Sequence, residues 1–173
     1  TIPNIISIIC NADITQRACY TRLDVLLLLS IPREVSMIKV IMMCGICGSG
    51  KTTYAKQKEK EGYVRLSIDE EMWKTYGRKG VDYPNEQYEK LSEIVEMALQ
   101  KKLLSLIQQG KNVVLDFSFW NKANRAYYKK LIEKAGGTPE LVYMKASKET
   151  LRKRLYKRNQ SLNANSPFII TNE

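Results

Sequence analysis

The sequence predicts an α/β fold in which helices cover a mainly parallel β-sheet. From Met37 onward, short apolar runs alternate with segments whose apolar residues recur every three or four positions. Strands and helices that alternate at this spacing form right-handed βαβ units, which build an open parallel sheet. The 173 residues, 44% hydrophobic and 27% charged, are enough for one domain with a buried core and argue against a disordered or membrane-spanning chain.

The first predicted unit is a strand, a glycine-rich turn, a helix and a second strand. Residues 38–44 are mostly apolar and end at a glycine, as expected for a strand that is buried on both faces. The helix is predicted from Lys51 to about Lys60, with Gly62 as its stop signal. The second strand is predicted at 63–68, which places Asp69 at its carboxyl end.

The remaining elements continue the same alternation. Pro84 and Asn85 mark the entry to the longest helix, and Gly110 marks its end. Ser147 is placed to cap the last helix. The other predicted elements are a strand at 113–115 that ends at Asp116, a helix at 122–135, a strand at 141–144 and a helix at 148–159.

The charge and the absence of histidine restrict the chemistry. The formal net charge is +10 and the pI is near 9.4, which predicts an anionic partner such as a nucleotide, a nucleic acid or an acidic surface. Histidine is absent, which excludes a Ser-His-Asp triad, a Cys-His dyad, a histidine-ligated zinc site and a histidine general base. Acid–base chemistry must therefore use carboxylates, lysine, cysteine or tyrosine.

A composition boundary lies at Met37. Residues 1–36 carry three basic and three acidic side chains, so the whole net charge of +10 lies in 37–173. We interpret Met37 as the natural start of the domain at 37–173, and 1–36 as an extension of doubtful origin that is not native; the alternative is a genuine apolar helical extension that packs on the domain. Four cysteines do not suggest a disulfide framework, and no targeting signal is visible, so we expect a cytoplasmic protein that does not engage a membrane.

The turn between the first strand and the first helix has the spacing of a phosphate-binding loop. It fits the pattern G-x-x-x-x-G-K-[ST], in which glycines let backbone N–H groups surround phosphate oxygens at a helix N-terminus. Lys51 is predicted to reach the β- and γ-phosphates, and the Thr52 hydroxyl to bind Mg²⁺. The loop residues are Gly45, Ile46, Cys47, Gly48, Ser49, Gly50, Lys51 and Thr52.

Cys44 and Cys47 also form a C-x-x-C pair, which permits a second interpretation as a redox dithiol. The strand before the pair and the glycine-rich run after it favour phosphate binding.

Two aspartates are predicted at the carboxyl ends of strands, where open α/β sheets bind their ligands. Asp116 follows a buried strand and is predicted to bind Mg²⁺ or its water shell; the alternative is a helix cap or a solvated turn. Asp69 is a candidate general base that deprotonates an acceptor hydroxyl. Alternatively, Ser67 or Asp69 caps a helix that begins with Glu70 and Glu71.

The last predicted helix is strongly basic. Arg154 and Arg158 lie four residues apart and therefore share a side of it. Phosphoryl transfer needs cations because the transition-state charge spreads over three oxygens. We predict that both arginines clamp the transferred group; the alternative is a solvated face.

These residues resemble the kinase branch of P-loop proteins from Met37 to about Arg158. This group includes small AAA-type ATP-binding proteins, the 5′-kinase domain of polynucleotide kinase, chloramphenicol phosphotransferase and zeta-toxin kinases. The matching motifs are the loop through Thr53, Ser67-Ile68-Asp69, Leu115-Asp116 and the run from Lys153 to Arg158. The resemblance implies a three-layer αβα P-loop nucleoside triphosphate hydrolase fold with core strand order 2-3-1-4. It also implies Asp69 as base, Arg154 and Arg158 on a lid over ATP, and Asn124 and Arg125 on the acceptor side.

The chain departs from this group at one position that bears on the acceptor. Polynucleotide kinases carry an arginine three residues after the base aspartate, whereas this chain has Met72. We therefore expect a small-molecule or nucleotide acceptor for the γ-phosphoryl group of ATP, with a nucleic acid permitted but not favoured. A polynucleotide 5′-hydroxyl kinase and an ATPase module without an acceptor remain as alternatives. The tail at 163–168 resembles a segment that leads into further structure, so the domain is predicted to be truncated at its C-terminus.

Overall fold

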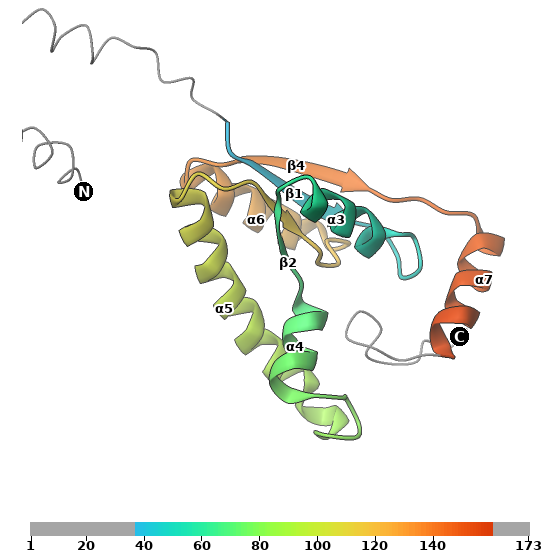
Figure 1. The fold of residues 1–173 in the computed structure, drawn as a ribbon. Helices are drawn as coiled ribbons and strands as arrows, with labels where there is room; N and C mark the ends of the chain where they lie inside the picture. Colours follow the sequence, from blue (N-terminus) through green and yellow to red (C-terminus); the bar gives the residue numbers. More distant parts are fainter. Residues whose placement is uncertain (1–36, 161–173) are drawn as a thin grey trace, which may run out of the picture. The chain divides into compact units, whose positions relative to one another are not determined.

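The computed structural model describes residues 37–160, which fold around a four-stranded parallel sheet (Figure 1). Its strand order is β2-β3-β1-β4, as the resemblance implied. Every pairing in the sheet is parallel, and the central strand β1 pairs with β3 on one side and β4 on the other. The strands are β1 (Lys39–Cys44), β2 (Val64–Leu66), β3 (Val113–Leu115) and β4 (Thr138–Tyr143).

Helices connect consecutive strands and cover both faces of the sheet. Because side chains alternate along a strand, β1 contributes to two apolar layers. Val40 and Met42 pack in a large core with side chains of α5 and α6, whereas Ile41 and Met43 pack against Ala55 of α3. This is the predicted three-layer αβα fold. The helices are α3 (Lys51–Lys60), α4 (Ile68–Tyr76), α5 (Tyr88–Gln108), α6 (Lys122–Lys134) and α7 (Lys148–Asn159), with a short 3₁₀ turn at Asn85–Gln87.

The second strand is shorter than predicted, which changes the location of Asp69. The strand ends at Leu66, and Ile68 already belongs to α4. Ser67 is the N-cap of this helix, and its side chain accepts a hydrogen bond from the backbone N–H of Glu70 at 3.4 Å. Asp69 therefore lies in the first turn of α4 and is not needed as its cap. The predicted strand extended to Ile68 because this apolar residue continues the run of β2, although Ser67 between them is the helix cap.

The fourth strand begins earlier than predicted. It pairs with β1 from Thr138 onward, and the backbone N–H of Thr138 donates to the carbonyl of Ile38 at 2.7 Å. Thr138, Pro139 and Glu140 lie outside the apolar run because β4 is an edge strand, which tolerates proline and polar residues. Leu141 and Tyr143 are half-exposed on this edge.

The carboxyl ends of β1 and β3 lead into the loops that form the site.

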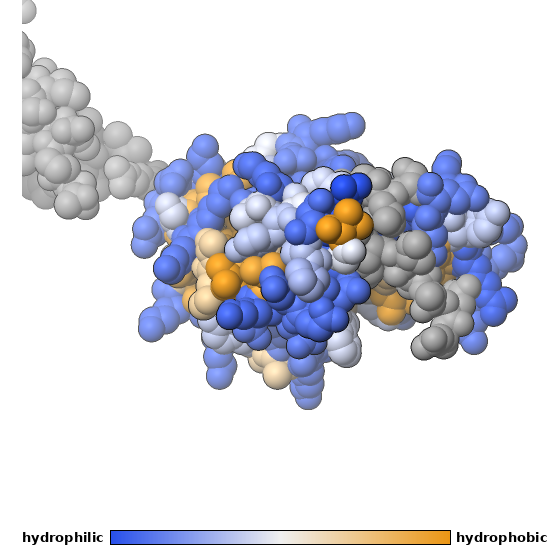
Figure 2. All heavy atoms as spheres, turned by 90° about the horizontal axis from the view of Figure 1, so that it is seen from below, coloured by the Kyte–Doolittle hydropathy of each residue, from blue (hydrophilic) through white to orange (hydrophobic). Residues whose placement is uncertain are grey.

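Among residues 37–160, none of the helices has the length and apolar character needed to cross a bilayer. The face seen from below is mostly hydrophilic, with hydrophobic side chains in small patches (Figure 2). The predicted extension at 1–36 and the tail at 163–168 lie outside the described residues.

Candidate active site

The glycines give the loop between β1 and α3 a backbone shape that other residues rarely adopt. Gly45, Gly48 and Gly50 have φ angles of 141°, 78° and 108°, and Gly50 is the N-cap of α3. A Cβ atom added at Gly45 would lie 2.6 Å from the carbonyl oxygen of Met144. The loop therefore passes so close to the end of β4 that only glycine fits at its start.

Replacing Gly45 by alanine is expected to weaken ATP binding, because the added methyl group must displace the loop from Met144. Gly110→Ala is the matched control, since Gly110 also has a positive φ of 73° but nothing lies within 4 Å of its Cβ position. Isothermal titration with ATP compares the two folded variants. Equal ATP affinity in both would contradict this role for Gly45.

The loop borders a cleft with a volume of about 1030 Å³. Residues from Cys47 to Thr53 line the cleft, whereas Gly45 is buried and Ile46 is 60% exposed at the surface. The Ser49 side chain is also buried, and its hydroxyl has no hydrogen-bond partner among the described residues. The other lining residues are Tyr54, Lys56, Gln57, Asp69, Tyr88, Asp116, Ser118, Met144, Arg154 and Arg158.

The Lys51 ammonium group is held within the loop. Its Nζ donates hydrogen bonds to the carbonyl oxygens of Gly45 at 2.7 Å and Ile46 at 3.0 Å. Burial lowers the pKa of Lys51 from its ordinary value, and the nearby carboxylates of Asp116 and Asp69 oppose this effect. A partly desolvated cation at this position attracts anionic groups in the cleft.

Thr52 and Asp116 bring two oxygen donors together although 64 residues separate them in sequence. The Thr52 hydroxyl donates to Oδ1 of Asp116 at 3.3 Å. The described residues contain no cluster of three or more acidic, cysteine or histidine side chains that could form a metal cage. Mg²⁺ does not require one, because it binds through one or two protein oxygens together with phosphate and water. The pair therefore fits Mg²⁺ in the presence of a nucleotide.

Asp116 has a second partner that the sequence analysis missed. The Nε and Nη2 atoms of Arg65 both donate to Oδ2 of Asp116, at 3.1 and 2.7 Å. The side chains of Arg65 and Asp116 are only 3% and 4% exposed. The signal for Arg65 was a charged residue between two apolar residues of a short strand, Val64 and Leu66.

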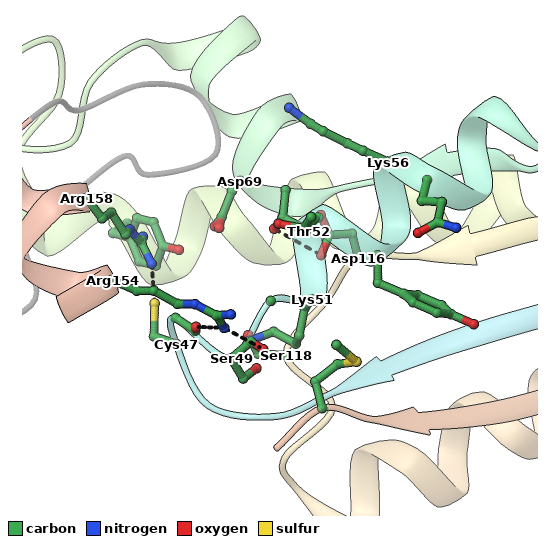
Figure 3. Close-up of a pocket in the computed structure, with 17 residues that line it drawn as sticks. Cys47, Ser49, Lys51, Thr52, Lys56, Asp69, Asp116, Ser118, Arg154 and Arg158 are labelled. Carbon is green, nitrogen blue, oxygen red and sulfur yellow. Dashed lines mark hydrogen bonds between the residues drawn. The ribbon is translucent and has the colours of Figure 1, made fainter. Parts of the chain in front are cut away.

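Asp69 lies in the cleft opposite the phosphate loop. Figure 3 shows its carboxylate between Arg158 on one side and Thr52 and Asp116 on the other. Burial raises the pKa of Asp69 above its ordinary value, and the charge of Asp116 raises it further. The cations Arg158, Lys51 and Arg65 oppose the shift. A carboxylate with a raised pKa is a better proton acceptor than an ordinary exposed aspartate.

The two arginines of α7 reach the phosphate loop. Arg154 Nη1 donates to the carbonyl oxygens of Gly48 at 3.1 Å and Ser49 at 3.3 Å. Arg158 Nη1 contacts the sulfur of Cys47 (Figure 3). The structure thus brings both predicted arginines to the cleft. Cys44 and Cys47 are free cysteines, the first buried at the end of β1 and the second in the loop.

The predicted acceptor-side residues do not line the cleft. Asn124 and Arg125 are on α6, and Arg125 Nη1 donates to the carbonyl oxygens of Phe119 at 3.0 Å and Trp120 at 2.7 Å. Arg125 thereby holds the loop that follows β3, and its acceptor role stays a prediction. Among the tyrosines near α5, Tyr88 lines the cleft and Tyr83 is buried in the core.

The fold and the loop together define a class of protein. A parallel sheet of order 2-3-1-4, a glycine-rich loop that leads into α3, and an aspartate after the neighbouring strand make this chain a P-loop protein of the kinase-like type. Residues 40–169 match the family model described as an AAA domain. The chain belongs to this family.

Similar proteins agree with this assignment. A UPF0200 protein of Pyrobaculum aerophilum is 30% identical over 125 residues, which span 72% of this chain and 69% of that protein. A candidate kinase of Chloroflexus aurantiacus has a TM-score of 0.58 at 20% identity, over 70% of this chain and 67% of the other. A chain of the Pnkp1/Rnl/Hen1 RNA repair complex has a TM-score of 0.60 at 20% identity, over 75% of this chain but only 42% of the other. At this identity the two structures share the fold with this chain.

Proposed function

We propose that this protein is an ATP- and Mg²⁺-dependent kinase, which transfers the γ-phosphoryl group of ATP to a hydroxyl of a small molecule or nucleotide. The observation that carries this proposal is the position of Asp69. Its carboxylate lies in the same cleft as the phosphate loop and the arginines of α7, but on a different element from both. An ATP-binding module without an acceptor has no evident need for a partly buried carboxylate there.

The cations of the cleft suit the charge of a transferred phosphoryl group. Lys51, Arg154 and Arg158 come from two elements and converge on the loop. They would stabilise the negative charge on the phosphate oxygens as it redistributes in the transition state. Thr52 and Asp116 would hold Mg²⁺, which when bound neutralises charge on the phosphates.

Asp69 would act as the general base. The acceptor oxygen attacks the γ-phosphorus while its proton passes to a carboxylate oxygen of Asp69. The bond between the γ-phosphorus and the bridging oxygen breaks, and ADP leaves. Asp69 must be ionised before the step, so the shift of its pKa sets the acid limit of activity.

The residue at the position of the polynucleotide kinase arginine favours a small acceptor. Met72 is 2% exposed and packs in the core beneath α4, so this position offers the cleft no cation for an acceptor phosphate. Of the cations that line the cleft, Lys51, Arg154 and Arg158 lie beside the phosphate loop, where ATP itself is a sufficient anionic partner. The fourth, Lys56, lies 3.9 Å from a carboxylate oxygen of Glu70.

A transfer screen tests the proposed function. Purified protein is incubated with γ-labelled ATP, Mg²⁺ and panels of nucleosides, aminoglycosides, amino sugars and RNA 5′ ends. We expect label on a hydroxyl of a small molecule or nucleotide. Label that appears only in inorganic phosphate would indicate the ATPase module, and label on RNA ends the polynucleotide kinase.

A further inference from the structure

Arg65 is a buried cation that lies outside the cleft lining. It occupies the middle of β2, and its side chain is 3% exposed. A guanidinium group that loses its water needs charged partners in good geometry, and leaving either side of such a pair unmatched is strongly unfavourable. The partners of Arg65 therefore indicate what this position does.

One partner is the predicted metal ligand. Two N–H groups of Arg65 bind the same oxygen of Asp116, Oδ2, whereas Oδ1 accepts the hydrogen bond from Thr52. A carboxylate held through one oxygen by two donors cannot rotate freely. Arg65 thus determines which oxygen of Asp116 faces the Thr52 hydroxyl.

A second partner adjoins the candidate base. Arg65 Nη1 donates to Oε2 of Glu70 at 2.8 Å, and Glu70 follows Asp69 in the first turn of α4. Lys56 Nζ lies 3.9 Å from Oε1 of Glu70. Lys56 lies one turn after Thr52 on α3. The side-chain contacts, together with this turn of α3, therefore form a ring that joins α3, β2, α4 and the loop after β3. Its members, in order, are Thr52, Asp116, Arg65, Glu70 and Lys56.

We propose that Arg65 is a positioning residue that fixes the metal-facing oxygen of Asp116 and the first turn of α4, which carries Asp69, in one rigid unit beside the phosphate loop. This inference rests on the proposed function. Arg65 is not among the residues that line the cleft, so we expect it to contact neither ATP nor the acceptor. It acts through the two carboxylates that it holds.

The charge of Arg65 supports the same role. Burial is the largest effect that disfavours the ionised form of Asp69, and the charge of Asp116 is the next largest. Arg65 is among the cations that oppose both effects, with Arg158 and Lys51. Loss of the cation would leave Asp116 unneutralised beside Asp69. The pKa of Asp69 would then rise further, and a larger fraction of the base would be protonated at neutral pH.

Arg65→Met tests the positioning role without relying on transfer activity. The readout is the Mg²⁺ enhancement, defined as the ratio of ATP affinities measured by titration calorimetry with and without Mg²⁺. We expect the enhancement to fall roughly 10- to 100-fold, as is usual when a residue that orients a metal ligand is removed. Hydrogen exchange should also become faster in the first turn of α4. Arg65→Lys should retain more of the enhancement than Arg65→Met, because lysine keeps the positive charge but lacks the planar set of N–H donors of the guanidinium group.

Further variants separate positioning from a structural role. Glu70→Ala removes only the contact between Arg65 and α4, so it should accelerate exchange in α4 and leave the Mg²⁺ enhancement close to wild type. Lys129→Met removes an ion pair on the exposed face of α6 and controls for the loss of a cation. A folded Arg65→Met protein with wild-type enhancement and exchange would overturn the proposal, whatever its melting temperature. If Arg65→Met does not fold, unchanged enhancement in Arg65→Lys together with unchanged exchange in Glu70→Ala would overturn it.

The two proposals fail separately. If the wild-type protein transfers phosphate to no acceptor, the kinase proposal fails, while the Mg²⁺ enhancement and the exchange rates still test Arg65. If transfer occurs, the acid limb of its pH profile should move to higher pH in Arg65→Met, which loses the charge, and should move much less in Arg65→Lys, which keeps it. An unmoved limb in Arg65→Met would contradict the electrostatic part of the role.

Discussion

Replacing Asp69 by asparagine is expected to reduce phosphate transfer by about 10²- to 10⁴-fold, the usual contribution of a general base, while ATP affinity changes little. Asparagine has nearly the same shape as aspartate but cannot accept the acceptor's proton. The groups that we propose to bind the nucleotide phosphates lie on the phosphate loop and α7, which the substitution does not touch. Single-turnover transfer and ATP titration on the same preparation measure the two effects.

The pH dependence and the stability of this variant should change together. Burial and Asp116 raise the pKa of Asp69, so wild-type transfer should fall as the pH drops through this raised value. The folded state favours the protonated side chain, so the ionised form destabilises the fold at higher pH. Asp69→Asn should therefore melt at a higher temperature than the wild type near neutral pH, and the difference should vanish in acid as the wild-type carboxyl becomes protonated.

Glu71→Gln is the matched control for Asp69→Asn. Glu71 lies in the same first turn of α4 and also interacts with the positive end of the helix dipole, but it does not line the cleft. Its replacement should leave transfer near the wild-type rate. An Asp69→Asn protein with normal transfer would exclude Asp69 as the base.

Much of the fold could be predicted because its signals are local. The glycine-rich loop with its lysine requires a strand before it and a helix after it, and both are present as β1 and α3. Boundaries were less predictable where two signals overlap. Ile68 continues the apolar run of β2, yet Ser67 caps a helix at the same point, and the cap determines where the strand ends.

The contacts within the site depend on tertiary packing and could be predicted only in part. The resemblance and the position of strand ends placed Asp69, Asp116 and Lys51 at one edge of the sheet, and the structure brings them into one cleft. The sequence could not indicate that Arg65 holds Asp116. This ion pair depends on the register between β2 and β3, in which Arg65 lies opposite Val114. Similarly, nothing in the sequence near Arg125 indicated that its side chain bonds the loop after β3.

Lys51→Ala is expected to weaken both ATP binding and phosphate transfer, whereas Asp69→Asn should reduce transfer alone. A charge-assisted hydrogen bond to phosphate contributes about 1.5–3 kcal/mol, so ATP affinity should fall roughly 10- to 100-fold. Transfer at saturating ATP should fall by a further factor on the order of 10² to 10³, as when one donor to a developing anionic charge is lost.

The contacts of Lys51 in the structure make this result specific to ligand binding. Its Nζ is already bonded to the carbonyl oxygens of Gly45 and Ile46, so alanine also releases the loop from its own lysine, while alanine suits the first position of α3. The loss should therefore appear in ATP affinity and rate, with little change in helix content by circular dichroism. Lys60→Ala, which removes an exposed lysine at the other end of α3, should alter neither affinity nor transfer. Equal losses in the two variants would mean that the net charge of α3, and not the position of Lys51 in the phosphate loop, governs nucleotide binding.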